Sequence, residues 1–136
     1  MRILIADDHP IARRGLRMII AEAFGDADCT EAADSATALT LAVALRPDLV
    51  LVDMHMPGDV TAPDLCRMMR AARPDSKIVI VTAFDAPHEI RDCLTAGADG
   101  CLLKDTSETD MAAALRTVVT GTPAERAAVV SFVAVG

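Results

Sequence analysis

Five polar residues follow short apolar runs of the sequence, at the points where strands are expected to end. The runs consist mainly of Ile, Leu and Val, a composition typical of buried strands. The polar residues are Asp7, Asp8, Asp53, Thr82 and Lys104. If the runs form parallel strands, their carboxyl ends share one edge of a sheet, and carboxylate, hydroxyl and ammonium groups meet there. Such a set predicts phosphoryl transfer to an aspartate with bound Mg2+.

The carboxylates predict the metal site. Like charges at close range repel unless a cation compensates them, and Mg2+ is a hard ion that a few carboxylates and waters hold. We expect Asp8 to bind the ion directly and Asp7 to bind it directly or through water, with Asp53 in the same set. The backbone carbonyl of His55 is expected to face the same loop and to complete the ligands.

The remaining residues have separate roles in the predicted transfer. Asp53 is the candidate nucleophile, Lys104 supplies positive charge opposite the metal, and the Thr82 hydroxyl donates to a phosphate oxygen. Taken singly, Asp7 and Asp8 are typical of a helix cap, Thr82 of a strand and Lys104 of a solvated surface. Their joint placement at the ends of different strands favours a site.

Strand-like and helix-like segments alternate along the chain and position these residues. The expected strands are residues 2–6, 27–32, 48–52, 77–81 and 99–103, and the expected helices are residues 10–24, 35–46, 63–72, 87–96 and 108–120. Ser35 is expected to cap the second helix, and Ser107 with Asp110 resembles a capping box before the fifth. The α/β alternation predicts an open, doubly wound, parallel five-stranded sheet of flavodoxin-like order 2-1-3-4-5, numbered along the chain.

Composition limits the class of protein. With 136 residues, 52% of them hydrophobic, the chain is long enough for one domain with a core. No apolar run reaches the ~18 residues of a membrane span, and the first residues lack a signal-peptide pattern, so we expect a cytoplasmic protein. The net charge of −7 argues against direct contact with nucleic acid, since the clustered basic residues are only Arg13, Arg14 and Arg17.

The cysteines show no metal-ligand spacing. They lie in apolar surroundings and form no CxxC pair, so reduced, internal thiols are expected. They are Cys29, Cys66, Cys93 and Cys101.

Together these residues resemble the signature of response-regulator receiver domains of two-component systems, over residues 1–120. The family's order and spacing are met by the Asp7-Asp8 pair, by Asp53 with Met-Pro-Gly three residues later, by Thr82-Ala83 and by Lys104-Asp105. The segments 5–10 and 97–105 are similar to the NarL/FixJ branch in particular. The resemblance implies the (βα)5 receiver fold.

The resemblance also implies a function. A sensor histidine kinase would pass a phosphoryl group to Asp53 in a Mg2+-dependent step, for which small donors such as acetyl phosphate often substitute. Thr82 would move toward the phosphate, and the surface of the fourth helix, fifth strand and fifth helix would change. Related receivers dimerise through their first or fifth helix, so a phosphorylation-dependent homodimer is expected. The chain would not be an enzyme beyond slow hydrolysis of its own phosphoryl group.

Three departures from the family pattern stand out. Cys101 occupies the position of the usual Tyr or Phe that couples to Thr82, which leaves either a permanently permissive site or another residue, such as Phe84, to report the switch. The loop after Gly58 lacks the usual second glycine. Relatives continue into a DNA-binding domain, whereas residues 121–136 are expected to form an apolar tail without an output domain, in a natural single-domain receiver or a truncated form.

Two other functions compete with this interpretation. A pseudo-receiver would keep the fold as a binding module without phosphorylation, which Cys101 and the missing output domain favour. A phosphatase of the haloacid-dehalogenase type would need a second Asp two residues after Asp53, where His55 stands. The complete set of three carboxylates opposes both.

Overall fold

The computed structural model describes residues 1–83 and 86–126, in which five strands and five helices alternate. They are β1 (Arg2–Ala6), α1 (Pro10–Phe24), β2 (Asp28–Ala32), α2 (Ser35–Leu45), β3 (Leu49–Asp53), α3 (Ala62–Ala72), β4 (Lys77–Thr82), α4 (Pro87–Ala96), β5 (Gly100–Leu103) and α5 (Glu108–Thr120). The strands form one parallel sheet of order β2-β1-β3-β4-β5. The predicted fold class and strand order are confirmed.

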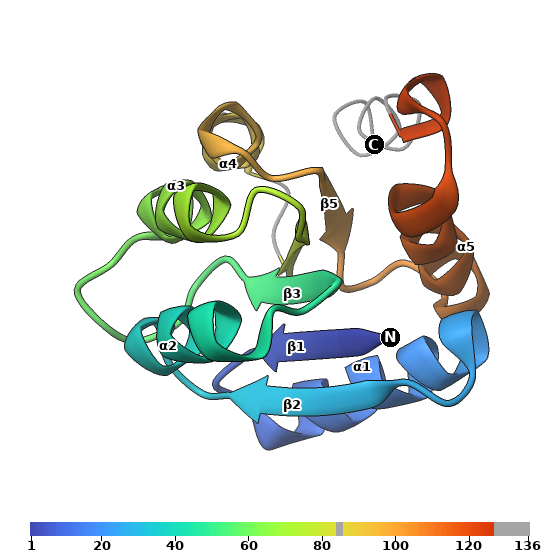
Figure 1. The fold of residues 1–136 in the computed structure, drawn as a ribbon. Helices are drawn as coiled ribbons and strands as arrows, with labels where there is room; N and C mark the ends of the chain where they lie inside the picture. The colour runs from blue at the N-terminus through green and yellow to red at the C-terminus, as the bar shows by residue number, and fades with distance from the viewer. Residues whose placement is uncertain (84–85, 127–136) are drawn as a thin grey trace.

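The helices cover the sheet on both faces (Figure 1). Helices α1 and α5 pack side by side on one face, and α2, α3 and α4 lie in a row on the other. This arrangement buries both sides of the central strands, which explains why their sequences are almost uninterrupted apolar runs. Every residue of β3 is buried, as are residues 3–6 of β1 and 78–82 of β4. The helices add Leu16, Ile20, Leu65, Met69 and Leu115 to the same core.

Two strands extend one residue beyond their predicted ends. Asp53 and Thr82 are the last residues of β3 and β4, because their backbones still pair with Val81 and Leu103 of the neighbouring strands. Strands β2, β3 and β5 also begin one residue later than predicted, and α3 begins one residue earlier. These shifts leave the polar residues at the carboxyl edge of the sheet.

The predicted cap of α2 is wrong by one residue. Asp34 is the N-cap, and its carboxylate accepts hydrogen bonds from the Thr37 backbone N–H at 2.8 Å and from the Thr37 hydroxyl at 3.0 Å. Ser35 is instead a buried first residue of the helix, with its hydroxyl 3.4 Å from the Val60 carbonyl oxygen. The Asp34 carboxylate satisfies a backbone N–H of the first helical turn, as a serine hydroxyl would, and it also places negative charge at the positive end of the helix dipole. The cap at Ser107 is confirmed by its hydrogen bond from the Asp110 N–H.

The four cysteines are buried or partly buried, and a short helical turn follows α5. Cys66, Cys93 and Cys101 are buried, Cys29 is partly buried, and all four are free thiols. Residues 123–126 form a helical turn after α5. Two predicted features lie outside the described residues: the role of Phe84 in reporting the switch, and residues 127–136 of the expected apolar tail. Within the described part of the chain, every helix is too short or too polar to cross a membrane.

Candidate functional site

The carboxyl edge of the sheet brings together the residues that the sequence analysis singled out. Asp7 and Asp8 follow β1, Asp53 ends β3, and these two strands are neighbours in the sheet. Thr82 ends the next strand, β4, and Lys104 follows β5. The Lys104 N–H donates a 2.7 Å hydrogen bond to the Thr82 carbonyl, which fixes the end of β5 against that of β4. The predicted convergence at one edge is therefore observed.

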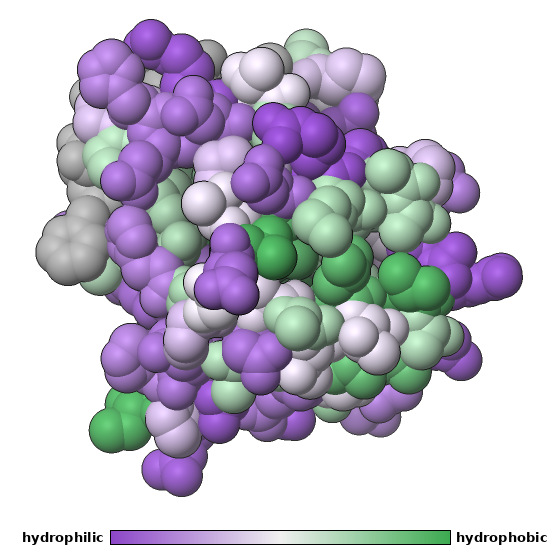
Figure 2. Space-filling view, turned by 90° about the vertical axis from the view of Figure 1, so that its left-hand side faces the viewer, coloured by the Kyte–Doolittle hydropathy of each residue, from purple (hydrophilic) through white to green (hydrophobic). Residues whose placement is uncertain are grey.

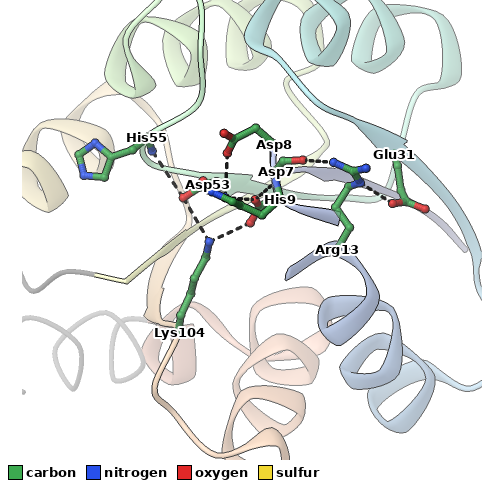
Figure 3. A network of polar contacts seen from close by, with 8 residues as sticks. All are labelled: Asp7, Asp8, His9, Arg13, Glu31, Asp53, His55 and Lys104. Carbon is green, nitrogen blue, oxygen red and sulfur yellow. Dashed lines mark hydrogen bonds and ion pairs between the residues drawn. The ribbon is translucent and has the colours of Figure 1, made fainter. Parts of the chain in front are cut away.

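An ammonium group links the two most buried carboxylates (Figure 3). Lys104 Nζ lies 2.9 Å from Asp7 Oδ2 and 3.5 Å from Asp53 Oδ1. The side chains of Asp7 and Asp53 are only 0% and 6% exposed. Two buried negative charges need compensation, and Lys104 supplies it in the structure.

The surroundings of the site raise the pKa values of both Asp53 and Lys104. Burial raises the pKa of the Asp53 carboxyl, and the nearby charge of Asp7 raises it further, against the opposing effect of Lys104. Burial lowers the pKa of the Lys104 ammonium, but the hydrogen bond to Asp7 and the charges of Asp53 and Asp7 outweigh burial and raise it overall. Asp53 therefore has to be held ionised by further positive charge if it is to act as a nucleophile.

The opening of the site is formed by Asp8 and His9. Asp8 Oδ1 is buried and accepts no assigned hydrogen bond among the described residues, but His9 Nδ1 lies at ion-pair distance from it, 3.1 Å away. One donor atom from each of four residues lies within 4.8 Å of the others, and these residues are Asp7, Asp8, His9 and Asp53. A buried carboxylate oxygen beside other oxygen donors fits a divalent cation such as Mg2+.

His55 touches the site through its backbone. Its N–H lies 3.5 Å from Asp53 Oδ1, whereas its imidazole Nε2 points away and lies 3.5 Å from Glu89 Oε2 of α4. Both partners of this imidazole–carboxylate pair are about half exposed. The expected role of the His55 carbonyl as a metal ligand stays a prediction.

Thr82 and Cys101 lie within the interior next to the site. Thr82 is fully buried, and Cys101 is 1% exposed on the adjacent strand β5. The hydroxyl role of Thr82 in holding a phosphate oxygen stays a prediction, as does the effect of Cys101 on the switch.

Arg13 and Glu31 belong to the surroundings of the site, although sequence analysis did not include them. Arg13 NH1 donates a 2.6 Å hydrogen bond to the Asp7 carbonyl, and its Nε donates to Glu31 Oε1, also at 2.6 Å. Arg17 reaches the other oxygen of Glu31. The side chains of both arginines hold the pKa of the Glu31 carboxyl below its usual range, chiefly through the hydrogen bond from Arg17. The spacing of Arg13 and Arg17 on α1 indicates a shared helix face, but no sequence pattern connects that face to β2.

A groove of about 770 Å3 opens beside Asp53 and runs along the loop between β3 and α3. Its walls combine apolar side chains, among them Met56, Val60 and Leu65, with the acidic groups of Asp8, Glu89 and Asp92. Figure 2 views the molecule from the side to which the arrowheads of β1 and β3 point in Figure 1, and it shows hydrophobic residues gathered next to hydrophilic ones on this face. The site is therefore open to a reactant at the carboxyl edge of the sheet.

Comparison with known proteins gives a consistent result. The family model described as "Response regulator receiver domain" matches residues 3–116. The nitrate/nitrite response regulator NarP of Escherichia coli (strain K12) is 36% identical over 115 residues, which cover 85% of this chain and 53% of NarP. NarL of the same strain is 33% identical over 119 residues, covering 88% and 55%. The chain thus spans about half the length of these relatives.

Solved structures agree with the sequence comparisons. The signal receiver domain of a response regulator NarL from Mycobacterium tuberculosis superposes with a TM-score of 0.80 at 31% identity, covering 89% of this chain and 97% of that one. A two-component response regulator of the LuxR family from Aurantimonas sp. SI85-9A1 superposes with a TM-score of 0.81 at 28% identity, covering 99% and 98%.

Proposed function

This chain belongs to the response regulator receiver domain family, and from that premise we propose that it accepts a phosphoryl group on Asp53 from a sensor histidine kinase, in a Mg2+-dependent step. One observation carries the proposal: Asp53 is buried between Asp7 and Lys104 at the carboxyl edge of the sheet, beside a groove open to reactants. Residues 1–120 form the receiver in this proposal.

The transfer makes one bond and breaks one. An oxygen of the Asp53 carboxylate attacks the donor phosphorus and forms a P–O bond, which gives an acyl phosphate. The bond from phosphorus to the donor atom breaks, and the electron pair leaves with the imidazole of a phosphohistidine or with the acetate of acetyl phosphate. Lys104 neutralises charge on the carboxylate and the arriving phosphoryl oxygens. The buried Thr82 hydroxyl donates to one of those oxygens after transfer.

The metal would be held by oxygen ligands at the opening of the site. Asp8 would bind it directly, Asp53 would belong to the same set, and Asp7, directly or through water, and the His55 carbonyl would complete it. When bound, Mg2+ supplies positive charge that compensates the carboxylates and the phosphoryl group. This compensation opposes the burial that otherwise raises the pKa of Asp53, and so favours the nucleophilic carboxylate.

The output of the proposed switch is a change in protein contacts. A phosphoryl group adds charge beside the ends of β3, β4 and β5, so the surface formed by α4, β5 and α5 is the expected responder. We propose that the change promotes a homodimer through the α1 or α5 surface, or docking of a partner. The net charge of −7, and the pairing of Arg13 and Arg17 with Glu31, support a switch that acts without direct nucleic-acid contact by this chain.

A pseudo-receiver function is not favoured. A scaffold that never binds a cation or phosphate would gain nothing from a buried Asp7–Asp53 pair or from the buried oxygen of Asp8. We also propose that the hydrolytic activity of the chain is limited to slow loss of its own phosphoryl group.

Intact-mass measurement tests the proposal. The protein is incubated with Mg2+ and acetyl phosphate, beside an Asp53→Asn variant and beside wild type with a chelator. We expect one phosphoryl adduct on wild type, and none on the variant or in the chelated sample. An unmodified wild-type protein, under conditions that modify another receiver domain, would contradict the proposal.

A further inference from the structure

We propose that Cys66 and Cys93 are a modification site: a peroxide oxidises them to a disulfide that joins α3 to α4. The proposed transfer to Asp53 uses neither thiol. The formation of the bond is therefore independent of the proposed function, and only its consequence for the movement of α4 rests on that function.

The two thiols meet in the interior of the molecule. Cys66 belongs to α3 and Cys93 to α4, two helices that pack against each other on the same face of the sheet (Figure 1). Both side chains are 0% exposed. A hydrogen bond joins the two thiols. A disulfide requires only that these sulfur atoms lose their hydrogens and approach to about 2.05 Å.

The backbones of the two helices are close enough for such a bond. Four residues after the cysteines, and so on the same helix faces, stand Arg70 of α3 and Gly97 at the end of α4. A Cβ atom added to Gly97 would lie 3.1 Å from the Cβ of Arg70. The Cβ atoms of a disulfide are usually about 3.5–4.5 Å apart, so the helices approach each other as closely as a disulfide needs. Arg70 Nη2 also donates a 2.8 Å hydrogen bond to the Gly97 carbonyl, which holds the helices together.

The surroundings of the pair make Cys93 the more reactive thiol. The hydrogen bond with Cys66 lowers the pKa of the Cys93 thiol, against burial and the charges of Asp92 and Glu89, which raise it. The same hydrogen bond, together with burial, raises the pKa of the Cys66 thiol. Because the thiolate is the nucleophilic form, Cys93 attacks the oxidant and Cys66 attacks second.

The reaction consumes one peroxide molecule and two thiols. The Cys93 thiolate attacks an oxygen of hydrogen peroxide, so that an S–O bond forms and the O–O bond breaks; the hydroxide that leaves takes up the proton lost by Cys93 and becomes water. The Cys66 sulfur then attacks the sulfur of this sulfenic acid. The S–S bond forms, the S–O bond breaks, and the hydroxyl leaves with the Cys66 proton as a second water. The two thiols together lose two electrons, which the peroxide gains.

Burial makes the modification conditional on movement of α4. Since neither thiol is exposed, peroxide reaches Cys93 only when the helix opens locally. Once formed, the disulfide excludes conformations in which α4 moves away from α3. Helix α4 contributes Glu89 and Asp92 to the groove beside Asp53, and its surface belongs to the expected responder. If the proposed function holds, oxidation leaves the phosphoacceptor intact but restrains the response of α4.

Peptide mapping after mild oxidation tests the inference. The reduced protein is treated with hydrogen peroxide, its remaining thiols are alkylated in denaturant, and the chain is digested without reductant. We expect a cross-link between Cys66 and Cys93, and a fall in alkylatable thiols from the four of the reduced chain to two. Cys29→Ala, a change on β2, should still lose two thiols, whereas Cys93→Ala should lose none.

Three results would overturn the inference. The first is a folded wild type that keeps all four thiols under a treatment that oxidises the chain in urea. The second is a cross-link from Cys66 to Cys101, the buried cysteine of β5, in place of Cys93. The third is conversion of Cys93 to a sulfinic or sulfonic acid without a cross-link. The map of the wild-type protein decides by itself if Cys93→Ala does not fold.

Hydrogen exchange separates the bond from its consequence. The amides of α4 should exchange about tenfold more slowly in the oxidised protein than in the reduced one. Acetyl phosphate with Mg2+ should alter the exchange of α4 in the reduced protein and much less in the oxidised one. An α4 that ignores acetyl phosphate in both forms would overturn the proposed response and leave the disulfide in place. A missing cross-link, with a normal response to acetyl phosphate, would overturn the disulfide and leave the proposed function in place.

Discussion

Lys104 Nζ lies 2.9 Å from Asp7 Oδ2, although the two residues are 97 positions apart in the sequence. The contact joins the loop after β5 to the loop after β1, across the end of β3 that carries Asp53. In the absence of a metal, the ammonium is the positive charge that makes two buried carboxylates tolerable.

Replacing Lys104 by alanine should destabilise the metal-free protein. The change leaves Asp7 and Asp53 buried without their compensating charge. We expect the free energy of unfolding at pH 7 to fall by about 2 kcal/mol, which is less than for a fully buried pair because the Lys104 side chain is 26% exposed. Added Mg2+ should raise the melting temperature of the variant more than that of wild type. Lys77→Ala, which changes the chain's other lysine at the opposite end of the sheet, is the control. An equal response of both variants to Mg2+ would argue against this role of Lys104.

Asp53→Asn should stabilise the metal-free protein at neutral pH. Because burial raises the pKa of Asp53 in the folded state, the folded protein binds its proton more tightly than the unfolded chain does, and the ionised carboxylate opposes folding above the folded-state pKa. The gain from the substitution should shrink as the pH falls through that pKa, and vanish below the unfolded value of about 3.9.

Urea unfolding from pH 3 to pH 8 without divalent ions measures this difference. Asp59→Asn, at an exposed loop position, controls for loss of one negative charge. A stability gain of Asp53→Asn that is the same at every pH would refute the electrostatic cause.

Arg13→Ala should weaken metal binding without removing any metal ligand. Arg13 holds the Asp7 carbonyl and is itself held by Glu31, so its loss frees the loop that carries Asp7 and Asp8. We expect the Mg2+ affinity to fall by about tenfold, as for other residues that orient metal ligands. Arg14→Ala removes the same charge from an exposed neighbouring position and should change the affinity little. Calorimetric titration measures the Mg2+ affinity of both variants. Equal losses of affinity in the two would show that Arg13 acts only through its charge.

Arg70 and Arg67 provide a matched pair on α3. The Arg70 guanidinium donates to the carbonyls of Gly97, Pro74 and Ser76 and to the carboxylate of Asp99, so it ties α3 to the turn before β5. Arg70→Ala removes all of these hydrogen bonds, although Asp99 Oδ2 keeps the one from the Ile78 N–H, and should cost about 2–4 kcal/mol of unfolding free energy.

Among the residues that the structure describes, Arg67 pairs only with Asp64 on the same helix, and this pair is exposed. Arg67→Ala should therefore cost less than about 0.5 kcal/mol. Chemical denaturation of both variants checks this difference, and similar losses would mean that the buried carbonyl contacts of Arg70 contribute little.

Sequence patterns predicted the parts of the fold that depend on local periodicity. The apolar runs around Leu51 and Ile80 are short and rich in Val and Ile, which favours strands buried on both faces, and strands that alternate with helices imply a parallel sheet. Parallel strands in turn bring Asp7, Asp53 and Lys104 to one edge. Strand β2 is confirmed because it pairs along its whole length with β1.

What the sequence could not predict depends on contacts between distant segments. Asp34 and Ser35 are both good helix caps, and only the position of Ser35 against Val60 decides between them. Arg13 stood out in the sequence only as one of three clustered basic residues, yet β2 brings Glu31 beside it. The approach of His9 to Asp8 follows from the turn after β1, which the residue types alone do not define.

The site of phosphorylation is the most direct test of the account. After incubation with acetyl phosphate and Mg2+, borohydride reduction converts an aspartyl phosphate to homoserine, and peptide mass spectrometry then locates the reduced residue. The account predicts homoserine at position 53 alone, and none when the donor is omitted or the metal is chelated. Homoserine at position 7 or 8, or an unreduced phosphoryl group on a histidine, would contradict the assignment of Asp53 as the acceptor.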